Sequence, residues 1–391
     1  MILKVLQNAL QEAKLHLRDI DGLIAVPSLA EDYFMEAHYH ATLLGLFGNQ
    51  SMRCRTIDTG GAGPISALLE AERLIRNDTL ECVAIVAADS VGSMTTDAFL
   101  DKADNIFWHL RRHEEERYQV QSPAIPHGYD LITQYQMENF GLTRNQLRMA
   151  VSLESFHAVH HPASLMTQKG QTFTSLEQVQ QAPKVTPNIS LLECARRADG
   201  AACLLVASNR FLARKGLLEP GLPILIGGGE ASGPLYPPSQ IDERTYASCQ
   251  QAMTAAYTSA GYLTAEDIDF FGLYDCFPIC LVRALEASGL CENGGSYLEE
   301  QYGRLMRCGD SNEARVELFR DKSFFPVNTH GGLLTYGAPW EVPAMYNVVE
   351  AVHQLRGVAR GRQIPDCQRA LVYGNGGVLS ASAVAIFSKS V

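Results

Sequence analysis

Groups that could transfer protons gather in a glycine-rich stretch of the chain, PVNTHGGLLTYGAPWEVP, at residues 326–343. The stretch begins like a strand and carries Asn328, His330, two adjacent glycines and, after a run of small residues, Tyr336. A neutral imidazole exchanges protons near pH 7, and a phenol does so when its neighbours tune its pKa from about 10. This composition is typical of an active-site loop.

Two further segments could supply reactive groups or backbone donors to the same site. Tyr274 and Asp275 follow an apolar run in FFGLYDCF, and a late turn reads YGNGG. Paired glycines permit positive φ and a close approach of the backbone, so their N–H groups are natural donors to an oxyanion. The glycines concerned are Gly331, Gly332, Gly376 and Gly377.

The composition limits both the size of the core and the choice of partners. The chain has 391 residues, of which 46% are hydrophobic and 19% are charged, so we expect two ordered domains with a sizeable core. The net charge of −11 at pH 7 argues against nucleic acid as a partner, because phosphate binding needs basic patches. A local basic patch for an anionic substrate such as coenzyme A is still compatible with this charge.

The spacing of cysteines and histidines does not favour a metal site. The ten cysteines include no CxxC pair, and Cys276 and Cys280 lack a second pair at zinc spacing. His157 and His161 stand four apart without an acidic companion, so we expect a solvated helix end rather than a metal site. No apolar run approaches ~18 residues, and a helical pattern opens the chain without a signal peptide. We therefore expect no membrane span, and reduced thiols in a cytoplasmic protein.

The same order of elements occurs twice along the chain. An early segment predicts a helix, then Asp19-Ile20-Asp21, then an apolar strand, and a late segment repeats this order around Asp267-Ile268-Asp269. In both copies a paired-glycine turn, a helix and another apolar strand follow. Strands that alternate with helices and are apolar on consecutive residues indicate parallel sheets with helices on both faces.

This repeat divides the chain into two homologous βαβαβ halves and an inserted domain. We assign 1–100 and 190–215 to the N-terminal half, 101–189 to an inserted loop domain of mixed structure, and 216–391 to the C-terminal half. The strand PILIGGGEASG, residues 223–233, has no counterpart in the first half, which leaves a sheet edge to be covered. Long inserts commonly carry binding functions, so we expect this one to contribute to the site.

The motifs DTGGAG, ECARRADGAA, YDCF, NTHGG and GNGG, in this order, resemble those of the thiolase superfamily, and most closely its sterol carrier protein x type. The resemblance covers nearly the whole chain. It implies a thiolase fold, which is an α/β protein whose two halves form an αβαβα layered core. It also implies a homodimer in which the sheets meet edge to edge near the first paired-glycine turn.

Three catalytic positions that this resemblance implies are missing. Thiolases use a nucleophilic cysteine at a helix N-terminus, where the thiolate is favoured, a histidine in a Gly-His-Pro turn and a second cysteine near the C-terminus. The matching turns here are residues 58–63 and 373–377, which contain no cysteine, and Gly337-Ala338-Pro339, which contains no histidine. We therefore expect no acyl-cysteine intermediate.

The tyrosines instead resemble those of the thiolase-like aldolases of bacterial steroid side-chain degradation, which cleave a β-hydroxyacyl-CoA by a retro-aldol reaction. The resemblance implies that Tyr274 and Tyr336 are the acid and the base, in either order. It leaves Asp275 to orient a partner or to bind the substrate. His330 either donates to the thioester oxygen, acts as the base or is structural. Asn328 either supports the oxyanion region or caps the loop.

Three functions are compatible with these observations. They are a lyase that releases a ketone or aldehyde and a short acyl-CoA, an acyltransferase such as an acetyl-CoA acetyltransferase with relocated residues, and a non-catalytic acyl-CoA or lipid-binding subunit. The missing cysteines count against the second function, and proton-transfer groups in converging loops count against the third. The resemblance also implies a coenzyme A thioester as substrate, no permanently bound cofactor, and a small partner protein that combines an OB fold with a zinc ribbon and helps to hold the acyl-CoA.

Overall fold

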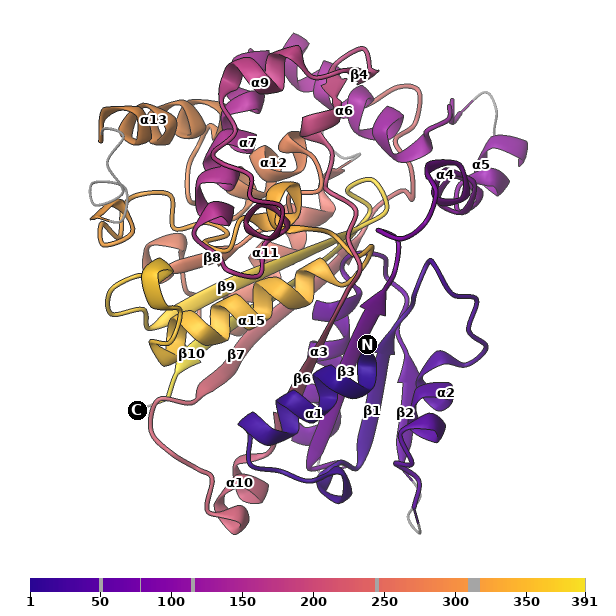
Figure 1. Ribbon diagram of the computed structural model, residues 1–391, viewed down its shortest axis with the longest axis vertical. Coiled ribbons are helices and arrows are strands. Elements are labelled where there is room, and N and C mark those ends of the chain that lie inside the picture. The colour runs from indigo at the N-terminus through magenta and orange to yellow at the C-terminus, as the bar shows by residue number, and fades with distance from the viewer. Residues whose placement is uncertain (49–51, 78, 114–116, 243–245, 309–316, 391) are drawn as a thin grey trace.

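Two four-stranded sheets form the framework of the computed structural model, which describes residues 1–48, 52–77, 79–113, 117–242, 246–308 and 317–390 (Figure 1). The first sheet has the order β2-β1-β3-β6 and the second has the order β7-β10-β9-β8. The strands of the first sheet are β1 (Gly22–Val26), β2 (Arg53–Thr56), β3 (Cys82–Asp89) and β6 (Gly200–Ala207). Those of the second are β7 (Pro223–Ser232), β8 (Phe270–Gly272), β9 (Arg369–Gly376) and β10 (Ala381–Lys389).

Helices separate and cover the two sheets. α3 (Gly63–Arg76) and α15 (Pro343–Arg356) lie between them and pack against strands of both. α1 (Ile2–Glu12) and α2 (Glu36–Leu43) pack on the first sheet, and α11 (Ser248–Ser259), beside α12 (Pro278–Ala287), packs on the second. The predicted αβαβα layers are therefore confirmed. β3 and β9 are buried on both faces in the way that their unbroken apolar sequences predict.

The repeated Asp-Ile-Asp motif has the same local structure in both halves. Asp21 precedes β1, and its carboxylate accepts the N–H groups of Glu81 and Cys82 at the start of β3, at 2.7 and 3.0 Å. Asp269 precedes β8, and its Oδ2 accepts the N–H of the first residue of β9 and that of the residue before it, at 3.0 and 2.8 Å. Each aspartate thereby joins the starts of two parallel strands, which explains why the motif recurs at equivalent positions of the duplicated sequence.

The two halves differ at the edges of their sheets. β10 lies between β7 and β9, whereas within the described residues β6 pairs only with β3 and forms an edge. This observation agrees with the predicted absence of a β7 counterpart in the first half. The second half in turn has a shortened counterpart of β2, because the start of the 326–343 stretch forms only an isolated parallel bridge, between Val327 and Phe271.

The inserted segment contains several helices and a pair of short strands. A capping box of Thr143 and Gln146 begins its long helix α7. In Figure 1 the insert gathers at one end of the two sheets. Its elements are α4 (Thr96–Asn105), α5 (Trp108–His113), α6 (Ala124–Phe140), α7 (Arg144–Val159), α8 (Leu165–Gln168), α9 (Leu176–Gln181), β4 (Lys184–Thr186) and β5 (Ile189–Ser190).

The remaining elements are short or peripheral. Within the described ranges, no helix combines the length and the apolar composition that crossing a membrane requires. The other helices are α10 (Asn209–Lys215) and α13 (Gly294–Arg307), and the helical turns are η1 (Leu17–Asp19), η2 (Leu191–Glu193), η4 (Ala265–Asp267), η5 (Gly332–Tyr336) and η6 (Arg360–Arg362).

Candidate active site

A cavity of about 600 Å³ opens where the two halves and the insert meet. Its wall includes the glycine turn between β2 and α3, the glycine turn that follows β9, Tyr274 from the end of β8 and Tyr129 from α6 of the insert. Most of the other lining side chains are apolar, among them Phe99, Leu100 and Phe107. A volume of this size suits a small-molecule ligand with a bulky apolar part.

The two glycine turns meet backbone to backbone at this cavity. A Cβ atom added to Gly60 would lie 2.7 Å from the Cα of Gly376, and one added to Gly376 would lie 1.9 Å from the carbonyl oxygen of Thr59. Gly60 also has φ of +62°, which favours glycine. Neither turn therefore has room for a side chain without a movement of the backbone, and their peptide groups form part of the wall of the cavity.

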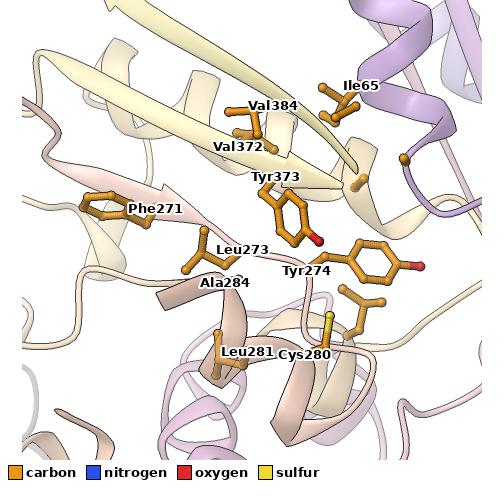
Figure 2. Close-up of a cluster of buried hydrophobic side chains, with 14 of the residues drawn as sticks. Ile65, Phe271, Leu273, Tyr274, Cys280, Leu281, Ala284, Val372, Tyr373 and Val384 are labelled. Atoms are coloured by element: carbon orange, nitrogen blue, oxygen red, sulfur yellow. The ribbon is translucent and has the colours of Figure 1, made fainter. Parts of the chain in front are cut away.

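Tyr274 places its phenol against the first of these turns. In Figure 2 its ring extends from the core cluster beside Tyr373, with the hydroxyl directed away from Phe271. A Cβ added to Gly61 would lie only 2.1 Å from the Tyr274 Oη and 2.4 Å from the carbonyl oxygen of Asn375. The phenol thus occupies the space that a side chain at position 61 would take.

Burial raises the pKa of Tyr274 well above its ordinary value, and Cys276 and Glu341 add to the increase. The phenol is therefore neutral near pH 7 and can donate a proton or a hydrogen bond.

The insert is bonded to the second glycine turn. The Asn375 side-chain amide donates to the Tyr129 hydroxyl at 2.7 Å, and this hydroxyl donates to the carbonyl oxygen of Gly377 at 3.3 Å. The ring of Tyr129 stacks on Phe277 with centroids 4.6 Å apart. These contacts hold α6 against the C-terminal half and make Tyr129 part of the cavity.

Asp275 lies behind the cavity and holds the loop that follows the NTHGG motif. Its Oδ1 accepts the Leu333 N–H at 2.8 Å and its Oδ2 accepts the Leu334 N–H at 3.1 Å, at the start of η5. Burial raises the pKa of this carboxyl to about 7 although both hydrogen bonds oppose the increase. A Cβ on Gly332 would lie 2.2 Å from Oδ2, so glycine is required where the loop meets Asp275.

Asn328 is fully buried and joins the loop to the end of β8. Its Oδ1 accepts the Leu273 N–H at 2.7 Å, and its Nδ2 donates to the Leu273 carbonyl at 2.8 Å and to Glu154 Oε1 at 3.0 Å. Next to it, Gly331 has φ of +108° and approaches α7 so closely that a Cβ would lie 2.5 Å from that of Ala158. Asn328 thus fixes the loop to Leu273 and α7. The two roles considered above for Asn328 were support of the oxyanion region and capping of the loop.

Tyr336 and His330 belong to an aromatic cluster that is separate from the residues lining the cavity. We define this aromatic cluster as His161, His330, Tyr336 and Tyr346. The ring of Tyr336 lies 4.9 Å from that of His161, 5.2 Å from that of His330 and 5.4 Å from that of Tyr346, measured between centroids. Burial raises the pKa of Tyr336 to about 12.

A buried ion pair lies near the aromatic cluster. Arg362 Nη2 lies 3.0 Å from Glu350 Oε2, both side chains are almost fully buried, and Thr329 donates to Glu350 at 2.6 Å. Burial lowers the pKa of His330 to about 3, so its imidazole is neutral, and its Nδ1 has no hydrogen-bond partner among the described residues. A neutral imidazole is compatible with each of the roles considered above for His330, namely donor to the thioester oxygen, base or structural residue.

His157 corrects the expectation of a solvated helix end. Its side chain is buried, its Nδ1 lies 3.2 Å from the carbonyl oxygen of Asn328, and its ring packs against Phe319 and Phe325. Burial lowers its pKa to about 3. The helix α7 turns this residue toward the loop rather than toward solvent, because α7 packs between the loop and α13.

The structure thus divides the predicted site residues into three groups. Tyr274, Gly376 and Gly377 line the cavity. Asp275, Asn328, Gly331 and Gly332 position the loop behind it. His330 and Tyr336 lie in the aromatic cluster.

Sequence reasoning missed four charged groups that line the cavity: Asp58, Asp104, Arg197 and Glu341. Glu341 is buried, its Oε2 has no hydrogen-bond partner among the described residues, and burial together with Asp58 and Asp89 raises its pKa well above the usual range. The signal available in the sequence was a single acidic residue in the otherwise apolar stretch that follows Gly337-Ala338-Pro339.

Comparison with known proteins places this geometry in a class. Residues 236–389 match the family described as thiolase C-terminal domain-like. Among solved structures, an Ltp2-ChsH2(DUF35) aldolase superposes with a TM-score of 0.75 at 20% identity, covering 99% of this chain and 92% of the other. The Acat5 thiolase from Ascaris suum in complex with coenzyme A superposes with a TM-score of 0.66 at 14% identity, covering 99% and 92%. The chain therefore has the thiolase fold, and its C-terminal part is similar to proteins of the thiolase superfamily.

Within that superfamily the chain is similar to proteins of the sterol carrier type. It is 27% identical to sterol carrier protein 2 from Bos taurus over 359 residues, which cover 90% of this chain and 61% of the relative. It is 28% identical to an acetyl-CoA acetyltransferase from Methanothermobacter thermautotrophicus over 277 residues, which cover 71% of this chain and 66% of the relative. The chain therefore spans about three fifths of the length of the sterol carrier proteins that it matches.

Proposed function

We propose that the protein is a thiolase-fold lyase that cleaves a bulky, steroid-like β-hydroxyacyl-CoA by a retro-aldol reaction. The products are a ketone or aldehyde and a short acyl-CoA. The observation that carries the proposal is the wall of the cavity, where two glycine turns without cysteine meet and the phenol of Tyr274 fills the space at position 61. The site thus offers a proton donor and peptide groups where an acyl-transfer enzyme needs a nucleophilic thiol.

The reaction needs only proton transfer and stabilisation of an anion. A base removes the proton of the β-hydroxyl, the Cα–Cβ bond breaks, and its electron pair forms an enolate on the thioester. An acid then returns a proton to the α-carbon. In our proposal Tyr274 performs one of these proton transfers, and groups at the wall of the cavity donate hydrogen bonds to the enolate oxygen.

The lining of the cavity agrees with a large apolar acyl group. Aromatic and aliphatic side chains from the insert, including Phe99, Leu100 and Phe107, face the glycine turns across the cavity. Arg197 is the one cationic side chain among the described lining residues. It lies over the Phe99 ring at 4.8 Å, which fixes it at the apolar side of the cavity.

The decisive measurement is the release of a short acyl-CoA from a β-hydroxyacyl-CoA with a steroid or branched-ring substituent, followed by mass spectrometry. We expect cleavage by the wild-type chain, tested alone and with any small zinc-ribbon protein encoded next to it. The absence of cleavage in both arms, with acyl-CoA binding intact, would instead identify a non-catalytic acyl-CoA-binding subunit.

A specific observation keeps acyl transfer as the second candidate. Cys194 and Cys276 both line the cavity, although neither lies in the glycine turns. Burial, with a smaller effect of Glu193, raises the pKa of Cys194 to about 12, which disfavours the thiolate. No histidine is among the described residues that line the cavity, so neither thiol has an imidazole base there. Trapping an acyl group on either cysteine would establish this second function instead.

The surface next to β2 supports a homodimer, which we include in the proposal. β2 is the edge strand of the first sheet and most of its residues are exposed. Phe34 and Leu43, at the two ends of the neighbouring α2 region, are 86% and 68% exposed. Covering an exposed strand edge and these apolar side chains favours pairing with a second copy. We expect Leu43→Glu to convert a dimer to a monomer in light scattering, whereas a wild-type monomer would contradict the proposal.

The small partner with an OB fold and a zinc ribbon is also a proposal. Its support is the structural match to an Ltp2-ChsH2(DUF35) aldolase. Co-purification of a protein encoded in the same gene cluster, and an increase in acyl-CoA cleavage when it is added, would test this partner.

A further inference from the structure

Glu341 is a buried carboxyl group at the cavity that no element of the proposed reaction yet uses. It stands between Trp340 and the start of α15, and its residue is only 9% exposed. Its Oε2 has no hydrogen-bond partner within the described chain and lies 3.6 Å from where a Cβ of Gly63 would be, at the start of α3. A buried polar atom without a partner is destabilising, so a ligand that satisfies it gains affinity.

The charged groups around Glu341 are mainly acidic. Asp58 follows β2, Asp89 ends β3 and Glu36 begins α2, and all three raise the pKa of Glu341 in addition to its burial. Glu36 pairs with His40 at 3.1 Å, and Asp89 accepts backbone N–H groups of the loop after β1. Glu36 and Asp89 therefore have hydrogen-bond partners of their own, whereas Glu341 Oε2 has none among the described residues.

The cation in the cavity does not neutralise Glu341. The Arg197 guanidinium donates to the Met94 carbonyl at 3.4 Å and to Thr96 Oγ1 at 3.1 Å. Glu341 raises the pKa of Tyr274, which also lines the cavity and contributes no positive charge. Among the described residues, the surroundings of Glu341 therefore favour the protonated carboxyl at neutral pH.

A protonated carboxyl group has one O–H donor, and apolar or acidic surroundings can keep such a group neutral so that it donates to an oxyanion. We propose that Glu341 donates a hydrogen bond from its neutral carboxyl group to the thioester oxygen of the substrate and stabilises the enolate formed by C–C cleavage. This inference rests on the proposed lyase function. Glu341 does not transfer its proton in this step: Tyr274 and the base move the protons, and Glu341 holds the charge that develops on oxygen.

Two substitutions separate a hydrogen-bond donor from a base. Glu341→Gln keeps a neutral donor of nearly the same shape, whereas Glu341→Leu removes the donor and keeps the bulk. We expect Glu341→Leu to lower kcat about 100- to 1000-fold, as the loss of one oxyanion donor does, and Glu341→Gln to stay within about tenfold of wild type. Glu317→Gln, at an exposed surface ion pair with Arg320, is the matched control and should change nothing.

The pH profile provides a readout that a structural role would not move. Because the pKa of Glu341 is raised, wild-type cleavage should be complete below that pKa and fall as the pH rises through it. Glu341→Gln cannot ionise and should lose this alkaline decline. If Glu341→Gln is as inactive as Glu341→Leu, Glu341 acts as a base and the proposal is overturned. Full activity of Glu341→Leu would overturn it equally.

Infrared spectroscopy makes the test independent of turnover. Other buried carboxyl groups such as Asp275 also contribute near pH 7, so the Glu341 band is identified as the protonated-carboxyl band that is present in wild type and lost in Glu341→Gln. This band should shift when acetyl-CoA binds. If no β-hydroxyacyl-CoA is cleaved but this band shifts with acetyl-CoA, the lyase function fails while the neutral thioester donor stands. If the band that Glu341→Gln removes is missing in wild type at pH 7, the donor role fails whatever the activity.

Discussion

The cavity and the aromatic cluster show how two similar tyrosines can come to have different chemical environments. Tyr274 and Tyr336 are both largely buried, and burial raises the pKa of each. Tyr274 faces a cavity of about 600 Å³ and the peptide groups of a glycine turn, whereas Tyr336 is surrounded by the rings of His161, His330 and Tyr346. The difference teaches that access to a ligand, rather than residue type or a shifted pKa, distinguishes a reactive phenol from a packed one.

The largest expected effect tests this contrast directly. We expect Tyr274→Phe to lower kcat for β-hydroxyacyl-CoA cleavage about 100- to 10,000-fold, because it removes a proton-transfer group at the cavity. Tyr336→Phe should lower kcat less than about tenfold, because its ring packing is preserved. Steady-state kinetics of the two variants would measure this. An equal loss in both would show that Tyr336 reaches the substrate after all and would remove the contrast.

The second prediction concerns the ion pair near the aromatic cluster. Arg362→Met should lower the free energy of unfolding by about 3–5 kcal/mol, because it leaves Glu350 buried without its counterion. Chemical denaturation provides the measurement. Arg320→Met, at an ion pair that is 68% exposed on both sides, should lower it by less than about 1 kcal/mol. Similar values for the two variants would mean that the aromatic cluster does not depend on this pair.

The third prediction concerns the wall of the cavity. Gly61→Ala should lower the free energy of unfolding by about 1–3 kcal/mol and reduce cleavage, because its Cβ overlaps the Tyr274 hydroxyl and the Asn375 carbonyl. Gly361→Ala has no atom within 4 Å of the added Cβ and is the matched control. Thermal unfolding and kinetics of both variants test this. A fully active Gly61→Ala protein would show that the phenol does not lie against the turn in solution.

The smallest effect is expected at Asp275, which lies behind the cavity. The pKa of Asp275 is about 7 in the folded protein and 3.8 in the unfolded chain. The stability that this carboxyl group contributes is therefore fully present below pH 3.8 and is lost as the pH rises through 7. Asp275→Asn loses one of the two N–H bonds and should be less stable than wild type by about 1 kcal/mol at pH 5. The difference should shrink toward pH 8. Denaturation at both values measures it, and a constant difference would contradict the raised pKa.

The sequence predicted the architecture well, because local patterns repeat. The Asp-Ile-Asp motifs and the paired glycines occur at equivalent places in both halves. The local structure inferred for one copy of a motif therefore also applied to the second copy. The insert was described least closely, since it was predicted only as a domain of mixed structure and the long helices α6 and α7 were not given individually. Helix caps such as Thr143 were the signal that could have corrected this reading.

The site was predicted only in part, because side-chain direction depends on contacts between distant segments. Tyr336 follows two consecutive glycines with φ of +108° and +56°, and the π-helical turn η5 then directs its ring to the aromatic cluster. Glu341 owes its raised pKa first to burial and then to Asp58 and Asp89, which are more than two hundred positions away. Tyr129 reaches the cavity from the insert. None of these contacts between distant segments can be inferred from the spacing of residues within a short stretch of sequence.

The contact between the two glycine turns also bears on how such a protein can evolve. A cysteine introduced at Gly60 would place its Cβ 2.7 Å from the backbone of the other half, and one at Gly61 would collide with Tyr274. A single codon change therefore cannot restore a nucleophile without also shifting the opposing turn or replacing the tyrosine. Substitutions at the two turns are therefore coupled, because a side chain in one turn requires a compensating change in the residues that face it.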